Sequence, residues 1–249
     1  MAFGALIIGD EILSGRRSDK HLVRLIELLT ARGLRLNWAR YVGDDRAELI
    51  RIFRETLSGE DVVFSFGGIG ATPDDHTRQA AAAALGVELA LHPAAEKLIR
   101  DRFGAEITSH RLQMGEFPVG SNIIPNPYNQ IPGFAVARHF FVPGFPVMAW
   151  PMIEWVLDTH YAHLFHREDY VEQAITIWDG HEGGLVDLME RITRAYPDAT
   201  LFSLPSVAED GERRSVELGM KGKAGDVAAA MAQIKAEVSA RGLDWQDQI

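Results

Sequence analysis

DVVFSF at residues 61–66 runs directly into GGIGATPDDHT at residues 67–77, and this junction is the most informative part of the sequence. The first part is a short apolar run with β-branched and aromatic residues, which predicts a buried strand. The alanine-rich sequence that continues to Leu85 predicts a helix that starts at Asp74 or Asp75. Glycines between a strand and a helix let the backbone approach an anion and direct several N–H groups toward it. The junction therefore predicts a phosphate-binding turn.

This turn does not match the two best-known nucleotide-binding motifs. No Gly-Lys-Ser/Thr ends it, as a P-loop requires, and its glycines do not follow the dinucleotide-binding spacing. A plain tight turn, with Asp74 or Asp75 as a helix cap, is the alternative interpretation of the same residues. Two adjacent acids would repel a phosphate unless they share the site with a divalent cation. A phosphate site here therefore implies a metal ion.

Strand-like and helix-like segments alternate on both sides of the junction, which is typical of a parallel sheet covered by helices. Residues 104–134 hold Pro, Gly and Asn at close intervals and predict a loop-rich insertion. The other expected elements are strands at 3–8, 34–38 and 135–142, a helix capped by Ser18 with apolar residues from Leu22 to Leu29, a helix capped by Asp44 or Asp45 and reaching Leu57, and helices at 93–103 and 146–157.

Acidic residues follow two more of the predicted strands. Gly9-Asp10-Glu11 comes after the first strand, and Gly43-Asp44-Asp45 comes after the second. In an open parallel sheet the carboxyl ends of the strands meet at one edge, where ligands bind. Together with the glycine turn, these segments predict a single site at that edge.

Near residues 161–169 a histidine-containing segment precedes a new run of alternating apolar residues, and we place a domain boundary there. The following residues predict a strand, a helix, two strands and a final helix, which suggests a small α+β sandwich. We therefore expect an α/β protein with a three-layer, mostly parallel sheet in residues 1–166 and a small α+β domain in residues 167–249. His160, His163 and His166 at the boundary could ligate a metal, but a solvated linker helix is the favoured interpretation.

Four motifs together resemble the N-terminal family of competence/damage-inducible protein A (CinA). They are GDEILSG at 9–15, VGD at 42–44, GGIGATPDDHT at 67–77 and PGFP at 143–146, and their order and spacing match over about residues 3–160. The remaining 80 or so residues resemble the small accessory domain of that family by order of elements. The resemblance implies a molybdopterin-binding fold of the MoaB/Mog type.

The resemblance also implies the chemistry. Relatives of this fold bind molybdopterin for adenylylation, and the competence-type branch is described as a metal-dependent ADP-ribose pyrophosphatase. The expected ligand is thus a nucleotide or a pterin, including molybdopterin itself, with Mg, Mn or Co as cofactor. By motif, the expected catalytic residues are Asp75, Asp10 and Asp74, with Asp75 the first choice; the ligand- and phosphate-binding residues are Gly9, Glu11, Gly67, Gly68, Gly70, Thr72, Thr77, Pro143 and Gly144; and the metal ligands are Asp10, Asp44 and Asp75.

One departure from the family pattern bears on whether this chain catalyses a reaction or only binds the ligand. Where the family has Pro-Gly-Val-Pro-x-Glu-Met, this chain has a methionine, Met148, in place of the glutamate. A protein that binds molybdopterin or a nucleotide without catalysis is therefore the alternative function. The amidohydrolase domain of longer relatives does not follow here, so we do not expect nicotinamide-nucleotide deamidation.

The amino-acid composition limits which binding partners and which cellular location we expect. The net charge of −10, with Arg16 and Arg17 as the densest basic run, argues against nucleic-acid binding. No apolar stretch approaches the roughly 18 residues of a membrane span. The absence of cysteine excludes disulfides and thiolate metal sites and predicts a cytoplasmic protein. Because small domains commonly provide interfaces, we expect a homo-oligomer, with a homodimer favoured and assembly through residues 167–249.

Overall fold

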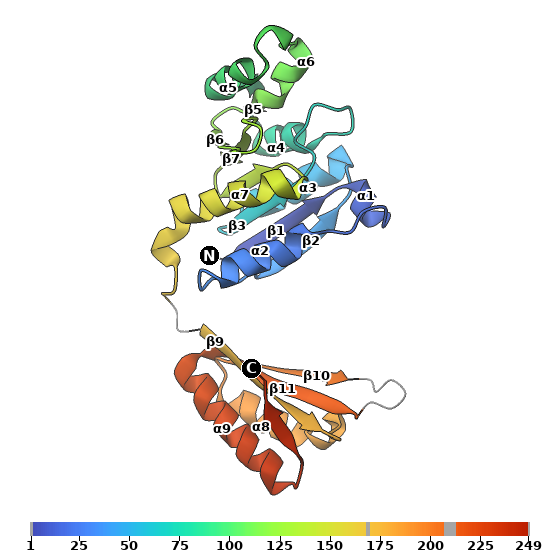
Figure 1. Ribbon diagram of the computed structural model, residues 1–249, viewed down its shortest axis with the longest axis vertical. Helices are drawn as coiled ribbons and strands as arrows, with labels where there is room; N and C mark the ends of the chain where they lie inside the picture. The colour runs from blue at the N-terminus through green and yellow to red at the C-terminus, as the bar shows by residue number, and fades with distance from the viewer. Residues whose placement is uncertain (1, 168–169, 207–212, 249) are drawn as a thin grey trace. The chain divides into compact units, whose positions relative to one another are not determined.

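The computed structural model describes residues 2–167, 170–206 and 213–248. They form two compact units, Met1–Phe165 and His166–Ile249 (Figure 1). The boundary lies one residue before the predicted one, so His166 falls in the second unit.

The N-terminal unit is built on a six-stranded sheet with the strand order β2-β1-β3-β8-β7-β6. The pairs β2–β1, β1–β3 and β3–β8 are parallel, whereas β7 and β6 run antiparallel to their neighbours. This confirms the expected mostly parallel sheet. The strands are β1 (Phe3–Ile8), β2 (Trp38–Val42), β3 (Val62–Phe66), β6 (Asn122–Ile124), β7 (Gly133–Val136) and β8 (His139–Val142).

Helices cover both faces of this sheet, which gives the expected three layers (Figure 1). Successive residues of β1 alternate between two hydrophobic cores, with Ala5 and Ile7 in one and Leu6 and Ile8 in the other. The first core lies under α2 (His21–Thr30) and α7 (Pro146–Val156), and the second lies under α3 (Arg46–Leu57), α4 (Thr77–Leu85) and α5 (Pro93–Phe103).

The predicted insertion at 104–134 contains more regular structure than expected. The strand β5 (Glu116–Pro118) pairs with β4 (Leu89–Leu91) in a separate antiparallel ribbon. The remaining short elements of this unit are α1 (Asp10–Leu13), α6 (Ser109–Leu112), the 3₁₀ turns η1 (Gly104–Glu106), η2 (Gln113–Gly115) and η4 (Ala162–Leu164), and the π-helical turn η3 (Leu157–Tyr161).

Two predicted boundaries near the N-terminus were wrong. The N-cap residue of α2 is Lys20, and the carboxylate that accepts from the first N–H groups of the helix, those of His21 and Leu22, belongs to Asp19 and not to Ser18. The second strand starts at Trp38, not near residue 34, because Leu34 is still bonded to the end of α2, where its N–H donates to the Leu29 carbonyl.

Two later segments also differ from the prediction. Residues 135–142 form a hairpin of β7 and β8, not one strand, because Ala137 has a φ of 52° and turns the chain back. The helix after the glycine turn starts at Thr77, not at Asp74 or Asp75. Thr77 is held there by its N–H and hydroxyl, which donate to carbonyls of the glycine turn.

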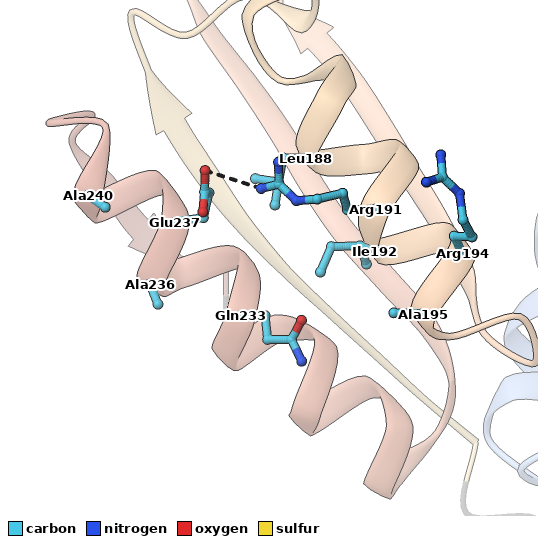
Figure 2. Close-up of a pocket in the computed structure, with 9 residues that line it drawn as sticks. All are labelled: Leu188, Arg191, Ile192, Arg194, Ala195, Gln233, Ala236, Glu237 and Ala240. Atoms are coloured by element: carbon cyan, nitrogen blue, oxygen red, sulfur yellow. Dashed lines mark ion pairs between the residues drawn. The ribbon is translucent and has the colours of Figure 1, made fainter.

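The C-terminal unit is a four-stranded antiparallel sheet in the order β10-β11-β9-β12, with two helices side by side on one face (Figures 1 and 2). The short strand β12, which pairs with β9, was not predicted. The elements are β9 (Tyr170–Trp178), η5 (Glu182–Gly184), α8 (Val186–Ala195), β10 (Thr200–Ser206), β11 (Ser215–Lys223), α9 (Ala224–Ala240) and β12 (Trp245–Asp247).

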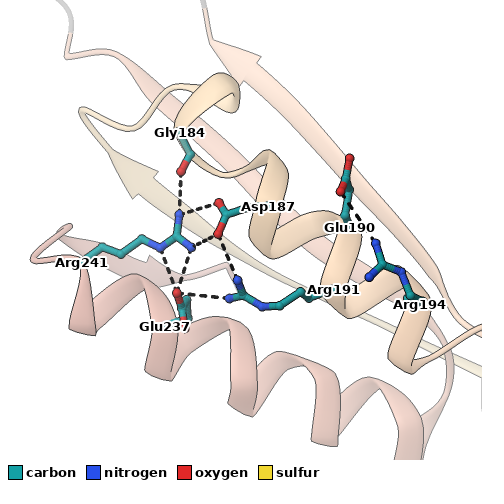
Figure 3. Close-up of polar contacts among 7 residues, drawn as sticks. All are labelled: Gly184, Asp187, Glu190, Arg191, Arg194, Glu237 and Arg241. Atoms are coloured by element: carbon teal, nitrogen blue, oxygen red, sulfur yellow. Dashed lines mark hydrogen bonds and ion pairs between the residues drawn. The ribbon is translucent and has the colours of Figure 1, made fainter.

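The two helices of this unit leave a groove of about 810 Å³ between them (Figure 2). At one end they are joined by Arg241, whose guanidinium bonds Asp187 and Glu237, and by Arg191, which reaches the same two acids (Figure 3). Among the described residues of the whole chain, no helix is long and apolar enough to cross a membrane.

Candidate functional site

A pocket of about 430 Å³ opens at the carboxyl ends of β1, β2, β3 and β8. This is the edge of a parallel sheet at which ligands bind in open α/β folds. The residues that line it are Ile8, Gly9, Glu11, Arg17, Asp44, Gly67, Gly68, Ile69, Gly70, Ala71, Thr72, Asp74, Asp75, Met114, Asn126, Asn129, Ile131, Pro132, Pro143, Gly144, Phe145 and Met148.

The glycine turn directs its carbonyl groups toward the start of α4. The Gly67 and Gly68 carbonyls accept from the hydroxyl and the N–H of Thr77, each at 3.0 Å. The Gly70 carbonyl accepts from Arg78 Nη2 at 2.6 Å and from Arg78 Nε at 3.2 Å. Three carbonyls of the turn are thus held on the helix side.

Most N–H groups of the same turn have no hydrogen-bond acceptor among the described residues. The Gly67 N–H donates to the Val142 carbonyl and the Thr72 N–H donates to the Asp75 carboxylate. Between them, the four amides of residues 68–71 have no acceptor among the residues that the structure describes. The C=O and the following N–H of a planar trans peptide point in opposite directions, so the N–H groups of residues 68, 69 and 71, which share peptides with the three helix-facing carbonyls, point away from the helix. The turn therefore presents a row of free donors.

Glycine is required at the start of this turn. Gly67 and Gly68 have φ values of 103° and 67°, which disfavour any residue with a side chain. A Cβ atom at Gly67 would overlap the Ile8 carbonyl, and one at Gly68 would overlap the Thr77 hydroxyl. The backbone at both positions therefore lies against β1 and α4 without room for a side chain.

Asp75 lies in the turn before α4, which corrects its expected place in the first turn of the helix. Its Oδ2 atom accepts from the Thr72 N–H at 2.9 Å and from the Thr72 hydroxyl at 2.5 Å, while the Asp75 N–H donates to the Thr72 carbonyl. No hydrogen bond to Oδ1 is formed by the described residues. One oxygen of Asp75 thus closes the loop, and the other is available to the pocket that Asp75 lines.

The acids after β1 and β2 hold each other. The Asp44 carboxylate accepts from the Asp10 N–H, and the Asp10 carboxylate accepts from the Asp44 N–H. Burial raises the pKa of Asp44, and the negative charges of Asp10, Glu11 and Asp74 raise it further. Asp44 therefore lies in a strongly acidic part of the pocket.

The expected metal ligands Asp10, Asp44 and Asp75 do not assemble a metal site by themselves. Within residues 2–167, 170–206 and 213–248, no three His, Asp or Glu side chains are grouped so that they could hold a metal ion. The same holds for His160 and His163, which lie in two different short turns, η3 and η4. The pocket thus offers individual carboxylate oxygens and no complete set of ligands.

Most of the residues predicted from the motifs line the pocket, and two do not. Asp10 lies beside the pocket and contacts it through Asp44. Thr77 is fully buried and holds the glycine turn from behind. The predicted residues that line the pocket are Gly9, Glu11, Asp44, Gly67, Gly68, Gly70, Thr72, Asp74, Asp75, Pro143 and Gly144.

The far wall of the pocket was not predicted. It comes from the segment 126–132, which two asparagines organise. Asn126 is buried and bonds the backbone of Tyr128 and Ile131, and Asn129 accepts from the Ile131 N–H. The closely spaced Pro, Gly and Asn residues of the insertion were the only signal for this wall in the sequence.

Two charged residues at the site were missed as well. Arg17 contributes the single basic side chain among the lining residues that the structure describes. Arg78 lies behind the glycine turn and bonds its Gly70 carbonyl. Neither belongs to a motif that announces an anion site, because an isolated arginine in a sequence is most often an exposed surface residue.

His21 supports the turn between β8 and α7. Its ring stacks on Phe66 at 4.6 Å between centroids, and Nε2 lies 3.1 Å from the Gly144 carbonyl. Burial lowers the pKa of His21. A neutral imidazole that donates from Nε2 therefore fixes the Pro143-Gly144 edge of the pocket.

Comparisons with known proteins agree with this architecture. The model of the probable molybdopterin binding domain family matches residues 4–163. A CinA-like protein from Anaeromyxobacter sp. (strain Fw109-5) is 37% identical over 167 residues, which are 64% of this chain and 41% of that protein. A protein from Caldivirga maquilingensis is 32% identical over 197 residues, covering 76% of this chain and 75% of that protein.

A solved structure shows the same fold. The crystal structure of the protein CinA with unknown function from Thermoplasma acidophilum has a TM-score of 0.58 and 29% identity, and the match covers 64% of this chain and 98% of that chain. The match to the Anaeromyxobacter relative spans less than half of that longer protein. With its glycine turn, its sheet and its family match on the same residues, this chain belongs to the family of the probable molybdopterin binding domain.

Proposed function

We propose that the protein binds a phosphate-bearing nucleotide or pterin in the pocket of the N-terminal unit. The observation that carries this proposal is the row of four consecutive amides, residues 68–71, that have no acceptor among the described residues and line the pocket. Successive backbone N–H groups of this kind form an anion-binding concavity. The family match to a probable molybdopterin binding domain supports a ligand of this size and chemistry.

We further propose that the ligand is a nucleotide pyrophosphate such as ADP-ribose, and that the protein hydrolyses it. The free amides would hold one phosphate, and Asp75 Oδ1 would orient a water molecule and accept its proton. The water oxygen would bond to one phosphorus as the bridging P–O bond breaks, which yields two phosphate monoesters. Glu11, Asp44 and Asp74 line the acidic side from which a cation would approach.

A divalent cation fits this site only in company with the ligand. Since the protein carboxylates do not form a complete ligand set, the cation would take oxygens from Glu11, Asp44 or Asp74 together with phosphate oxygens, as Mg²⁺ commonly does. When bound, such an ion neutralises phosphate charge and lowers the pKa of a bound water. Mg, Mn and Co are the proposed candidates.

The test is incubation with ADP-ribose in the presence of Mg, Mn or Co, followed by product analysis. We expect AMP and ribose 5-phosphate, and we expect both to disappear when a chelator is added. Binding without products would contradict the hydrolase and leave the alternative function, a non-catalytic binding protein. Met148 favours this alternative, because a thioether stands where the family has a glutamate, and its Sδ accepts from Asn129 at 3.3 Å.

A thermal-shift screen across nucleotides and pterins identifies the ligand without assuming turnover. A ligand present at 100 times its dissociation constant adds about 2.7 kcal/mol to the unfolding free energy. We expect stabilisation by phosphate-bearing compounds and not by their dephosphorylated forms. A flat response to all of them would contradict the binding proposal.

The assembly state is a separate proposal. We propose a homo-oligomer, with a homodimer as the simplest form, assembled through residues 167–249 in the cytoplasm. The sequence of residues 167–249 carries no glycine-rich phosphate loop and no clustered acids apart from one turn, which favours a role in assembly. Deletion of residues 167–249 should reduce the oligomer to monomers in light scattering and should leave ligand binding intact. An unchanged oligomer after the deletion would remove this proposal.

A further inference from the structure

Arg78, in the first turn of α4, is a fully buried cation behind the glycine turn. Its side chain is only 2% exposed. The guanidinium donates from Nε and Nη2 to the Gly70 carbonyl, and from Nη1 to the carbonyls of Gln113 and Glu116. All of its hydrogen bonds are therefore to backbone carbonyl oxygens.

No carboxylate neutralises this charge by direct contact. Among the described residues, no Asp or Glu oxygen lies within 4.0 Å of the Arg78 nitrogens, and Glu116 and Asp75 act on it only from a greater distance. Burial lowers the pKa of Arg78, but a guanidinium stays protonated in proteins. A buried charge is normally paired, because burial of an uncompensated charge destabilises the folded chain. Arg78 thus has no carboxylate counter-ion in contact with it among the residues that the structure describes.

The contacts of Arg78 connect it to the pocket from behind. Holding the Gly70 carbonyl directs the N–H of the same peptide unit, which belongs to Ala71, to the opposite side. The carbonyls of Gln113 and Glu116 flank Met114, which lines the pocket. Arg78 therefore joins the glycine turn to the segment around Met114, and its positive charge lies behind the free donors.

We propose that Arg78 is a positioning residue whose counter-ion is the phosphate of the ligand. It does not touch the ligand; it fixes the turn and supplies, through the Gly70–Ala71 peptide, the positive potential that the bound anion neutralises. This inference rests on the proposed phosphate binding. It also explains how a pocket with four acidic residues, Glu11, Asp44, Asp74 and Asp75, attracts an anion.

The test measures the affinity for inorganic pyrophosphate by calorimetry at low salt, with four variants of the full chain. Arg78→Gln keeps a hydrogen-bonding group but removes the charge, and should weaken binding about tenfold or more. Arg78→Lys keeps the charge and should lose about threefold. Arg32→Met removes another largely buried arginine that bonds a backbone carbonyl, Leu28, far from the pocket, and should bind as the parent does.

The fourth variant leaves Arg78 and all its contacts in place. Glu116→Gln removes the carboxylate charge that attracts the Arg78 guanidinium most strongly. The Glu116 carbonyl that Arg78 bonds is a backbone group, so this bond is kept. We expect pyrophosphate to bind about two- to threefold more tightly, and we expect added salt to abolish the difference. The variant remains informative if Arg78→Gln does not fold.

The outcomes separate this inference from the proposed function. If the parent protein does not bind pyrophosphate, phosphate binding itself fails and the role of Arg78 fails with it. If the parent binds, equal affinity of Arg78→Gln overturns the inference alone. The same holds if Arg78→Lys binds as weakly as Arg78→Gln, or if Glu116→Gln binds no more tightly than the parent.

Discussion

Asp10 and Asp44 exchange hydrogen bonds across the ends of two neighbouring parallel strands. The Asp44 Oδ2 atom lies 2.9 Å from the Asp10 nitrogen, and the Asp10 Oδ1 atom lies 3.2 Å from the Asp44 nitrogen. Each carboxylate thus accepts from the N–H of the other aspartate, two residues beyond the end of its strand. Of the two acids, Asp44 lines the pocket and Asp10 lies beside it.

The first prediction concerns the charge of Asp44. Asp44→Asn keeps an oxygen that can accept from the Asp10 N–H but removes a negative charge from the pocket. We expect the affinity for ADP-ribose without metal to rise about threefold, and the gain in affinity on adding Mg²⁺ to shrink. Asp10→Asn is the matched control, because it alters the same pair of hydrogen bonds but removes a charge that does not line the pocket. It should change the affinity for ADP-ribose less. Equal effects of the two variants would contradict the prediction.

Asp44 also gives the site a pH dependence with a defined sign. Because its pKa is raised, Asp44 loses its negative charge at a higher pH than an ordinary aspartate as the solution is acidified. Protonation removes repulsion from a bound phosphate. Metal-free affinity of the parent should therefore rise as the pH falls through the raised pKa, and this rise should be weaker in Asp44→Asn. Titration of both proteins with ADP-ribose across the acidic range measures it.

The second prediction separates two roles of Asp75. Asp75→Asn can still accept from Thr72 through its amide oxygen, so the melting temperature should hardly change. If Asp75 orients the attacking water, turnover of ADP-ribose should fall by about two to four orders of magnitude. Asp75→Ala should in addition cost about 1 kcal/mol of stability, because the Thr72 donors lose their acceptor.

Thr72→Val is the matched control for Asp75. It removes the hydroxyl that donates to Asp75 Oδ2 and keeps the backbone N–H that donates to the same oxygen. A residue that only closes the loop would make the two substitutions similar in activity. An active Asp75→Asn protein, or one no worse than Thr72→Val, would remove the catalytic assignment.

The third prediction concerns His139, which is buried in the sheet with Nε2 2.9 Å from the Thr56 hydroxyl. Burial lowers the pKa of His139 to about 4, from an ordinary value of 6.5. Between these two values the unfolded chain takes up a proton that the folded chain does not. The free energy of unfolding should therefore fall as the pH drops below 6.5, by up to about 1.4 kcal/mol per pH unit, and this component should level off near pH 4.

His139→Gln tests this directly, because a glutamine can bond Thr56 but does not titrate. Denaturant unfolding at about pH 7 and about pH 5 should show a smaller loss of stability in the variant than in the parent. Parallel losses in the two proteins would show that His139 does not carry the effect.

The elements that could be predicted are those with local causes. The strand before Gly67 and the turn that follows are set by a run of apolar residues and by glycines at positions of positive φ, and both signals lie within a few residues. The same holds for the cap of α3, where Asp45 accepts from the Glu48 N–H three residues later. Such patterns can be recognised in one sequence without knowledge of distant contacts.

The parts that were missed depend on contacts between distant residues. Arg78 bonds carbonyls 35 and 38 residues away, and Asn129 bonds Met148 nineteen residues away. No spacing rule connects such positions, so the far wall of the pocket and the charge behind the turn could not be predicted. The start of α4 was misplaced for a related reason: the hydroxyl and N–H of Thr77 are bound by carbonyls of the turn, which leaves Asp75 to close the loop.

The last prediction concerns the ion-pair network of the C-terminal unit (Figure 3). Arg241, the residue after α9, donates to both carboxylate oxygens of Asp187 at 2.9 and 2.6 Å and to the Glu237 carboxylate at 2.8 Å. The hydrogen bonds from Arg241 hold the pKa of Asp187 and of Glu237 below their ordinary values. A depressed carboxylate pKa contributes stability that is present above the ordinary pKa and is lost as the pH falls through the lowered one.

Arg241→Met should therefore lower the melting temperature of the C-terminal unit near neutral pH by a few degrees, and the difference from the parent should shrink in high salt and in strong acid. The effect should be modest because the carboxylates are exposed to solvent. Arg194→Met is the matched control, since Arg194 makes a single, longer ion pair of 3.8 Å with Glu190 in the same figure. Scanning calorimetry of both variants measures the difference. Two outcomes would show that the electrostatic account of this network is wrong. They are an equal loss of melting temperature in Arg194→Met and Arg241→Met, and an Arg241→Met loss that persists in high salt and strong acid. The loss would then come from packing of the aliphatic part of the arginine side chain.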